Sequence, residues 1–187
     1  SSTGTTGSNA ALQLIASQYN AEYGQVVSKP IQLKIGRNEI MVPDLVSFDA
    51  EHGGALYVQY TGASNAAQYS VRVSGGVKIP TLDLYGIDDA GQRLELVTAY
   101  MEELETYTAQ LEEQHNSTHK DSGIAAVDHD YNAQECILNT TDIVLDQMML
   151  SVPASQILAG LSGDNTAARA QELLNSLDAM DQMMVLF

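Results

Sequence analysis

The stretch QRLELVTAYMEELETYTAQLEEQ, residues 92–114, decides the fold class of the chain. Its apolar residues recur at steps of three and four, which predicts an amphipathic helix with one buried stripe. The stripe consists of Leu94, Val97, Met101, Leu104, Tyr107, Thr108 and Leu111. The other face carries Glu102, Glu103, Glu105, Glu112 and Glu113. A charge run of this kind is typical of a solvated helix face rather than of a catalytic carboxylate pair.

Upstream of this helix the sequence has the residue pattern of a β-sheet. Apolar and polar residues alternate between Gly, Pro and Asn, as in short strands joined by turns. The runs are PIQLKI (30–35), EIMV (39–42), LVSFD (45–49), GALYVQY (54–60) and QYSVRVSGGVKI (68–79). They predict a small antiparallel sheet or sandwich layer followed by a helical region, so the predicted fold class is α+β.

The chain is predicted to have four parts. They are a polar tail or vector remnant (1–10), an N-terminal helix and linker (11–28), a β-rich subdomain (29–80) and a helical subdomain (81–187). The N-terminal helix is inferred from the helical spacing of Leu12, Ile15, Ala16 and Tyr19.

Beyond residue 114 the sequence predicts a polar loop and then more helix. The loop is HNSTHKDSGIAAVDHDYN (115–132), and Thr141 and Asp142 are expected to form a capped turn. Pro153 is expected to start a short helix. A last helix follows Asp164 or Asn165 and reaches the apolar end MDQMMVLF, which has no polar stop. This end predicts a subdomain truncated at its C-terminal end, with homodimerisation through the exposed C-terminal helix.

The charge of the chain excludes several kinds of partner. It has 187 residues with 24 Asp and Glu against 8 Lys and Arg, a formal charge of −16. Such a surface repels phosphate backbones and anionic lipid, so we expect no nucleic-acid partner. No apolar run reaches the roughly 18 residues that a membrane helix needs, so no membrane span is predicted.

Candidate metal ligands and nucleophiles were weighed against ordinary structural roles. His115 and His119 have the spacing of a helical zinc pair, but Asn116 follows the first histidine where HExxH has Glu, so a solvated loop is favoured. His129 lies between two aspartates, and a surface loop is again favoured over a metal or proton-transfer site. Cys136 has no positive neighbour and is predicted to be a buried structural thiol.

The remaining candidates also favour structural roles. Asp88, Asp89 and Gly91 lack the spacing of a calcium loop and predict a turn before the helix. The seven methionines are expected to fill the core. We therefore predict no catalytic residue and no metal ligand in this chain.

The order of several phrases along the chain resembles the front part of an enhancin-like zinc metallopeptidase of the M-sixty family. The phrases are IQLKIGRNEIMVP, HGGALYVQYTG, VRVSGGVKIPTLDL, LVTAYMEELETYTAQL, NTTDIVLDQMMLSVPASQIL and LDAMDQMMVLF. The first matching residues are Gly53, Gly54, Leu56, Tyr57, Gly75, Gly76, Ile79 and Pro80. The second set is Thr141, Asp142, Met148, Ser151, Pro153, Ala154 and Ile157.

This resemblance implies a role for the chain that is not itself catalytic. HExxH is missing, so the chain would precede the zinc helix and contain no cofactor, with zinc held by the parent peptidase. The family implies hydrolysis of glycosylated or mucin-type proteins outside the cell, hence a secreted or cell-surface protein. The partners implied are the remainder of the peptidase domain and a glycoprotein or mucin substrate.

An alternative hypothesis is a self-contained extracellular adhesion or glycan-binding module. It is based on Tyr57, Tyr60 and Tyr69, which fall on neighbouring predicted strands. Tyrosine rings on a sheet surface can stack on sugar rings, although most strand tyrosines serve sheet packing.

Overall fold

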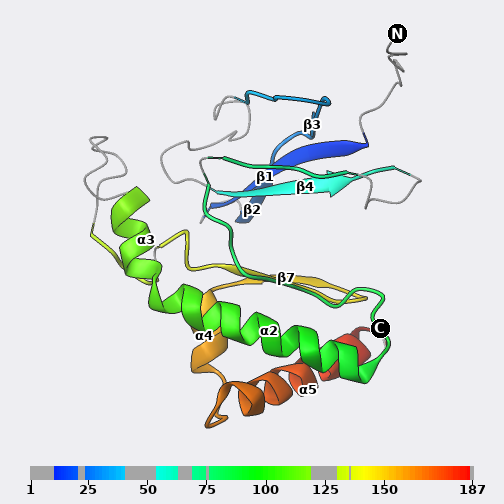
Figure 1. Ribbon diagram of the computed structural model, residues 1–187, viewed down its shortest axis with the longest axis vertical. Coiled ribbons are helices and arrows are strands. Elements are labelled where there is room, and N and C mark those ends of the chain that lie inside the picture. Colours follow the sequence, from blue (N-terminus) through cyan, green and yellow to red (C-terminus); the bar gives the residue numbers. More distant parts are fainter. Residues whose placement is uncertain are drawn as a thin grey trace. The chain divides into compact units, whose positions relative to one another are not determined.

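The computed structural model describes residues 11–20, 24–40, 54–62, 69–74, 76–118, 130–134 and 136–185. The chain forms two compact units, Ser1–Ser74 and Gly75–Phe187. The first unit is built from strands, and the second combines helices with a separate sheet (Figure 1). The predicted α+β class is confirmed.

One central strand organises the sheet of the first unit. The strands are β1 (Leu12–Asn20), β2 (Gly24–Val27), β3 (Ile31–Gln32) and β4 (Ala55–Tyr60). All three other strands pair antiparallel with β1, with β4 along one edge and β2 and β3 sharing the other. Leu14 lies opposite both Ile31 and Val58 in this ladder. Leu14 and Ala16 are buried and pack against Ile31, Leu33 and Ile40.

The predicted N-terminal helix within 11–28 is wrong, because β1 and β2 occupy this stretch. The two apolar side chains that become buried, Leu14 and Ala16, are two residues apart, which is the period of a strand. The spacing of Leu12, Ile15 and Tyr19 matched a helix by coincidence. Pairing with β4, which lies far away in the sequence, decides the conformation.

The other predicted strands of the first unit have mixed outcomes. Run 54–60 is confirmed as β4, whereas in run 30–35 the strand is limited to β3. After β3 the chain turns at Gly36, whose φ is 98°. The Asn38 side chain closes this turn with two hydrogen bonds of 2.9 Å to the backbone of Lys34. Run 45–49 lies outside the described residues, and the described parts of run 68–79 form no strand.

In the second unit the helices lie on one side of a three-stranded sheet (Figure 1). The elements are β5 (Thr81–Asp83), α2 (Ala90–Ala109), α3 (Leu111–Thr118), β6 (Thr141–Val144), β7 (Met149–Val152), α4 (Ala154–Ala159) and α5 (Thr166–Val185). Strand β5 runs parallel to β6, and β7 pairs antiparallel with β6. The part predicted to be purely helical therefore contains its own sheet, which is a correction.

The predicted helical stripe forms the centre of this core. Val97, Met101 and Leu104 are completely buried on α2. They pack with a row of sheet residues, Leu82, Ile143 and Leu150, which lie opposite one another in neighbouring strands. Burial of each such leucine stabilises the fold by about 1.5–3 kcal/mol.

Three helices start close to where the sequence predicts them. Asp89 Oδ1 accepts a hydrogen bond from the Gln92 amide at 2.7 Å, which confirms the turn before α2. Asn165 Oδ1 accepts one from the Ala168 amide at 3.0 Å at the start of α5. Pro153 precedes α4, as predicted.

Two local predictions for the second unit are wrong. Residues 115–118 continue as the helix α3 instead of entering a polar loop, because His115 gains burial there. Thr141 and Asp142 are the buried start of β6 rather than a capped turn. In both places a long-range contact outweighs the polar local sequence.

Two ion pairs join α2 to α5 and show that the helices run antiparallel. Arg93 near the start of α2 contacts Asp178 near the end of α5 at 2.6 Å. Arg169 near the start of α5 contacts Glu105 near the end of α2 at 2.9 Å. Glu105 is therefore an interhelical contact, whereas Glu102, Glu103, Glu112 and Glu113 are exposed as predicted.

Candidate functional site

The first unit brings two of the three candidate tyrosines together. The rings of Tyr60, at the end of β4, and Tyr69 have centroids 5.6 Å apart and are tilted by 44°. Tyr69 is 41% exposed and Tyr60 is partly buried. Such a tilted pair presents aromatic surface together with two phenolic hydroxyl groups, which can donate and accept hydrogen bonds.

The backbone around Tyr60 is held by neighbouring residues. The Thr61 amide donates a hydrogen bond of 2.7 Å to the Ala11 carbonyl, which ties the end of β4 to the chain just before β1. The Tyr60 ring lies over Gly62. A Cβ added at Gly62 would be 2.5 Å from Tyr60 Oη and 2.6 Å from Cζ. Because Gly62 has no side chain, the Tyr60 ring can occupy this space.

Tyr57 lies on the other face of the sheet from this pair. In the β1–β4 ladder Tyr57 is opposite Ile15, whereas Tyr60 is opposite Leu12. Residues three apart on a strand point to opposite faces. The predicted three-tyrosine surface is thus a surface of two rings, Tyr60 and Tyr69.

The residues that follow Tyr69 in the chain, up to residue 74, are exposed. Tyr69, Val71 and Val73 alternate along this extended segment and are 41%, 46% and 61% exposed. Arg72 lies between the two valines and is also exposed. An aromatic pair beside apolar and hydrogen-bonding groups suits a ligand with both apolar faces and hydroxyl groups, as a sugar ring has.

Comparisons of the chain with protein-family models, curated proteins and solved structures found no match. The resemblance to enhancin-like metallopeptidases accordingly stays a prediction.

A second chemical cluster lies inside the second unit, where His115 meets Cys136. The imidazole Nδ1 and the thiol Sγ are 3.7 Å apart, and the side chain of Tyr131 packs edge-on against the imidazole. His115 is 1% exposed and Cys136 is 6% exposed. The prediction of a buried thiol is confirmed, and the histidine in contact with it is His115.

This cluster has the environment of a packed core. Burial raises the pKa of Tyr107 to about 12, with a smaller contribution from the neighbouring Cys136. Burial likewise raises the pKa of Tyr131. Tyr107 donates its hydroxyl proton to the Leu138 carbonyl at 2.7 Å, which fastens the segment around Cys136 to α2. A nucleophile here would have to reach its substrate through a closed core, so the arrangement favours a structural role.

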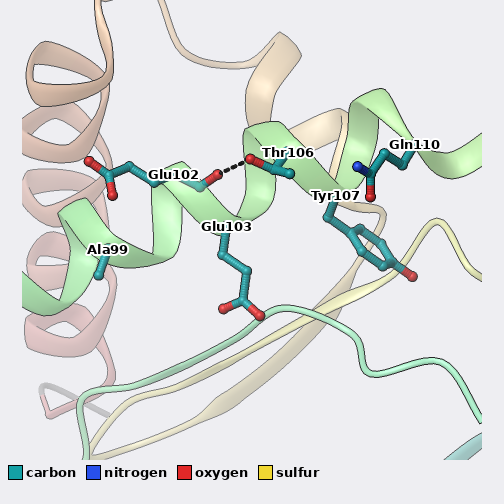
Figure 2. Close-up of a pocket in the computed structure, with 6 residues that line it drawn as sticks. All are labelled: Ala99, Glu102, Glu103, Thr106, Tyr107 and Gln110. Atoms are coloured by element: carbon teal, nitrogen blue, oxygen red, sulfur yellow. Dashed lines mark hydrogen bonds between the residues drawn. The ribbon is translucent and has the colours of Figure 1, made fainter.

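A shallow hollow of about 440 Å³ lies on the outer side of α2 (Figure 2). Its lining consists of Ala99, Glu102, Glu103, Thr106, Tyr107 and Gln110. Glu103 binds Lys78 Nζ at 3.2 Å, and the Tyr107 hydroxyl is engaged with Leu138. The hollow is an acidic surface feature whose central groups contact the protein itself, so we assign it no ligand.

The other sequence candidates do not assemble into a site in the described part of the chain. His119 and His129 lie outside the described residues. Across the described residues, no group of three or more His, Cys, Asp or Glu is placed to hold a metal ion. In that same portion, no helix is both long and apolar enough to cross a membrane.

One residue, Gly62, and one contact, between His115 and Cys136, were not singled out from the sequence. Gly62 sets the Tyr60 ring position, and the signal for it is the YTG end of a predicted strand, where glycine is expected to allow close approach. His115 contacts Cys136, which lies 21 positions later in the sequence, and no local sequence pattern predicts that contact.

Proposed function

We propose that the chain is a binding module whose first unit takes a carbohydrate on the Tyr60–Tyr69 pair. This proposal rests on the contact between the Tyr60 and Tyr69 rings. Their centroids are 5.6 Å apart, and Tyr69 is partly exposed to solvent. Tyrosine offers a large apolar area with little conformational entropy to lose, together with a hydroxyl group for the sugar. Glycans outside the cell, including those of mucin-type glycoproteins, are the proposed ligands.

The ordered sequence phrases support a proposed context for this module. They would place it at the front of a secreted enhancin-like zinc peptidase that acts on glycosylated proteins, with the zinc site in the remainder of the peptidase domain. A reading frame that continues from Phe187 into HExxH within roughly 100 residues would support this context. A stop codon directly after Phe187 would contradict the context and leave the binding proposal open to its own test.

The binding proposal is tested with a glycan array probed by the full chain, followed by calorimetry on the strongest ligand. Tyr60→Ala and Tyr69→Ala should each weaken binding by about tenfold or more, because each removes one stacking ring worth roughly 1 kcal/mol or more. Tyr57→Ala, on the opposite face, and Tyr85→Ala, an exposed tyrosine of the second unit, are the matched controls and should bind normally.

Three results would contradict the proposal. They are the absence of any bound glycan, unchanged affinity in Tyr60→Ala and Tyr69→Ala, and a loss in Tyr57→Ala as large as in the other two variants. Far-ultraviolet circular dichroism of every variant separates lost binding from lost folding. Zinc-dependent proteolysis by the purified chain would contradict a purely binding role.

A further inference from the structure

The buried face of α5 continues beyond the part of the helix that packs on the core. Leu173, Leu174 and Leu177 are almost fully buried. Met180 and Met184 follow Leu177 at steps of three and seven, so helical periodicity places them on the same side. They are 40% and 47% exposed, and Met183 beside them is 55% exposed. This Met face, defined as Met180, Met183 and Met184, corrects the prediction that the methionines fill the core.

Methionine is suited to a surface that receives another apolar segment. Its side chain is unbranched, flexible and polarisable, so it adapts to different partners, and exposed Met clusters are used in this way to bind helices. Three methionines within five positions of one helix therefore indicate a docking surface better than three dispersed apolar side chains would.

Carboxylates gather at the end of the unit where the Met face lies. Asp178 and Asp181 are on α5 itself. Asp146 is brought close by the turn between β6 and β7, where the Gln147 amide donates to Asp181 Oδ1 at 3.0 Å. Arg93 contacts Asp178 and also donates to the Ile87 carbonyl at 3.0 Å, which places the acidic start of α2, Asp88 and Asp89, at the same end of the unit.

The described basic residues of the second unit are all engaged in ion pairs. Gly75–Phe187 contains 19 acidic and 4 basic residues, whereas Ser1–Ser74 contains 5 and 4, so the second unit carries nearly all of the net charge. Of its four basic residues the structure describes Lys78, Arg93 and Arg169, and each is in an ion pair. The electrostatic field at the Met face therefore favours a positively charged partner.

We propose that the Met face docks a cationic amphipathic helix of a partner protein. The apolar side of such a helix would cover the three methionines, and its Lys or Arg side chains would reach the surrounding aspartates. A second copy of this chain fits less well, because a symmetric contact would bring the same carboxylates of both copies together. This proposal concerns the second unit and does not depend on sugar binding by the first.

The test uses the full chain and a synthetic peptide of Leu and Lys, about 18 residues long, with its leucines on one helical face. Fluorescence anisotropy at about 0.15 M salt should show binding, and a scrambled peptide of equal composition should bind about tenfold or more weakly. The variant Met180→Gln/Met184→Gln should lose affinity by a similar factor. Met149→Gln is the matched control, since Met149 is 50% exposed on β7.

Protection from oxidation locates the contact. Bound peptide should slow peroxide oxidation of Met180, Met183 and Met184, measured by mass spectrometry, and leave Met149 unaffected. Equal binding of the ordered and scrambled peptides would overturn the proposal, as would undiminished binding by the double variant. A dimer of the chain that Met180→Gln/Met184→Gln converts to a monomer would also overturn it, because a second copy would then cover this face.

Discussion

At Gly62 the absence of a side chain decides where the Tyr60 ring lies. We expect Gly62→Ala to push the ring out of its place, because the new Cβ would overlap the Tyr60 hydroxyl oxygen and two ring carbons at 2.5–2.8 Å. Sugar affinity should fall by about tenfold, as in Tyr60→Ala. Stability should change little, since the far end of a tyrosine side chain can rotate away. Calorimetric titration with the ligand measures the first effect, and urea unfolding measures the second.

Gly76→Ala is the control for that substitution. Nothing lies within 4 Å of a Cβ built at Gly76, so this variant should keep full sugar affinity. Equal affinity of Gly62→Ala and the wild-type chain would show that the Tyr60 ring position is not important for binding.

Tyr100 is a residue whose burial makes stability depend on pH. The Thr141 hydroxyl donates to the Pro80 carbonyl at 2.9 Å, so the Tyr100 hydroxyl donates to Thr141 Oγ1 at 2.8 Å. Burial raises the pKa of Tyr100 from 10.0 to about 12. Below pH 10.0 the folded and unfolded states both keep the proton, and this group adds no pH dependence. Between pH 10.0 and about 12 the unfolded state loses its proton first, so stability falls as pH rises.

The expected slope from Tyr100 in that window is about 1.4 kcal/mol per pH unit. Urea unfolding at a series of alkaline pH values measures it, and phenolate absorbance reports the titration. In Tyr100→Phe this part of the slope should disappear, at a cost of about 1 kcal/mol at neutral pH from the lost hydrogen bond. An identical slope in Tyr100→Phe and the wild-type chain would contradict the assignment.

The two ion pairs between α2 and α5 should differ in importance. Each arginine also donates to a backbone carbonyl, Arg93 to Ile87 and Arg169 to Gly163, but the Arg93 side chain is 13% exposed and the Arg169 side chain is 35% exposed. Arg93→Ala should therefore lower the free energy of unfolding by about 1–3 kcal/mol, and Arg169→Ala by about 1 kcal/mol or less. Thermal and urea unfolding of both variants show which one loses more stability, with Arg37→Ala as an exposed control. A larger loss in Arg169→Ala would contradict it.

The two units should also differ in how well they fold alone. The core of Gly75–Phe187 contains thirteen buried residues, whereas the described residues of Ser1–Ser74 include two buried core side chains, Leu14 and Ala16. A fragment of residues 75–187 should unfold cooperatively, and a fragment of residues 1–74 should be marginal because small sheets bury little apolar surface. Near-ultraviolet circular dichroism and urea titration test both. A 75–187 fragment without a cooperative transition would contradict this division of stability.

Much of the second unit was predictable from the sequence because its signals are local. The stretch 92–114 has a regular apolar period and forms most of α2 and the first turn of α3, with a break at Gln110 that the sequence did not predict. Asp89, Pro153 and Asn165 are residues with strong preferences for helix starts. A period and a cap depend on neighbours along the chain, so one sequence suffices to predict them.

The errors share a physical cause, which is contact between residues distant in sequence. The stretch 12–20 becomes a strand because β4, some 40 positions later, pairs with it. Residues 141–144 become a strand because β5 lies about 60 positions earlier. The candidate site changed for the same reason, since strand register separated Tyr57 from Tyr60, and Tyr69 contacts Tyr60 from outside that strand.

The sequence by itself determined the α+β class, the main helices with their caps and the strongly negative charge, because composition, periodicity and capping are properties of short stretches. Tertiary structure alone decided which tyrosines meet, that Cys136 packs on His115 and that the apolar face of α5 extends beyond its core. Those outcomes depend on register and on how far one element overlaps its partner, and neither quantity is encoded in the local pattern of residues.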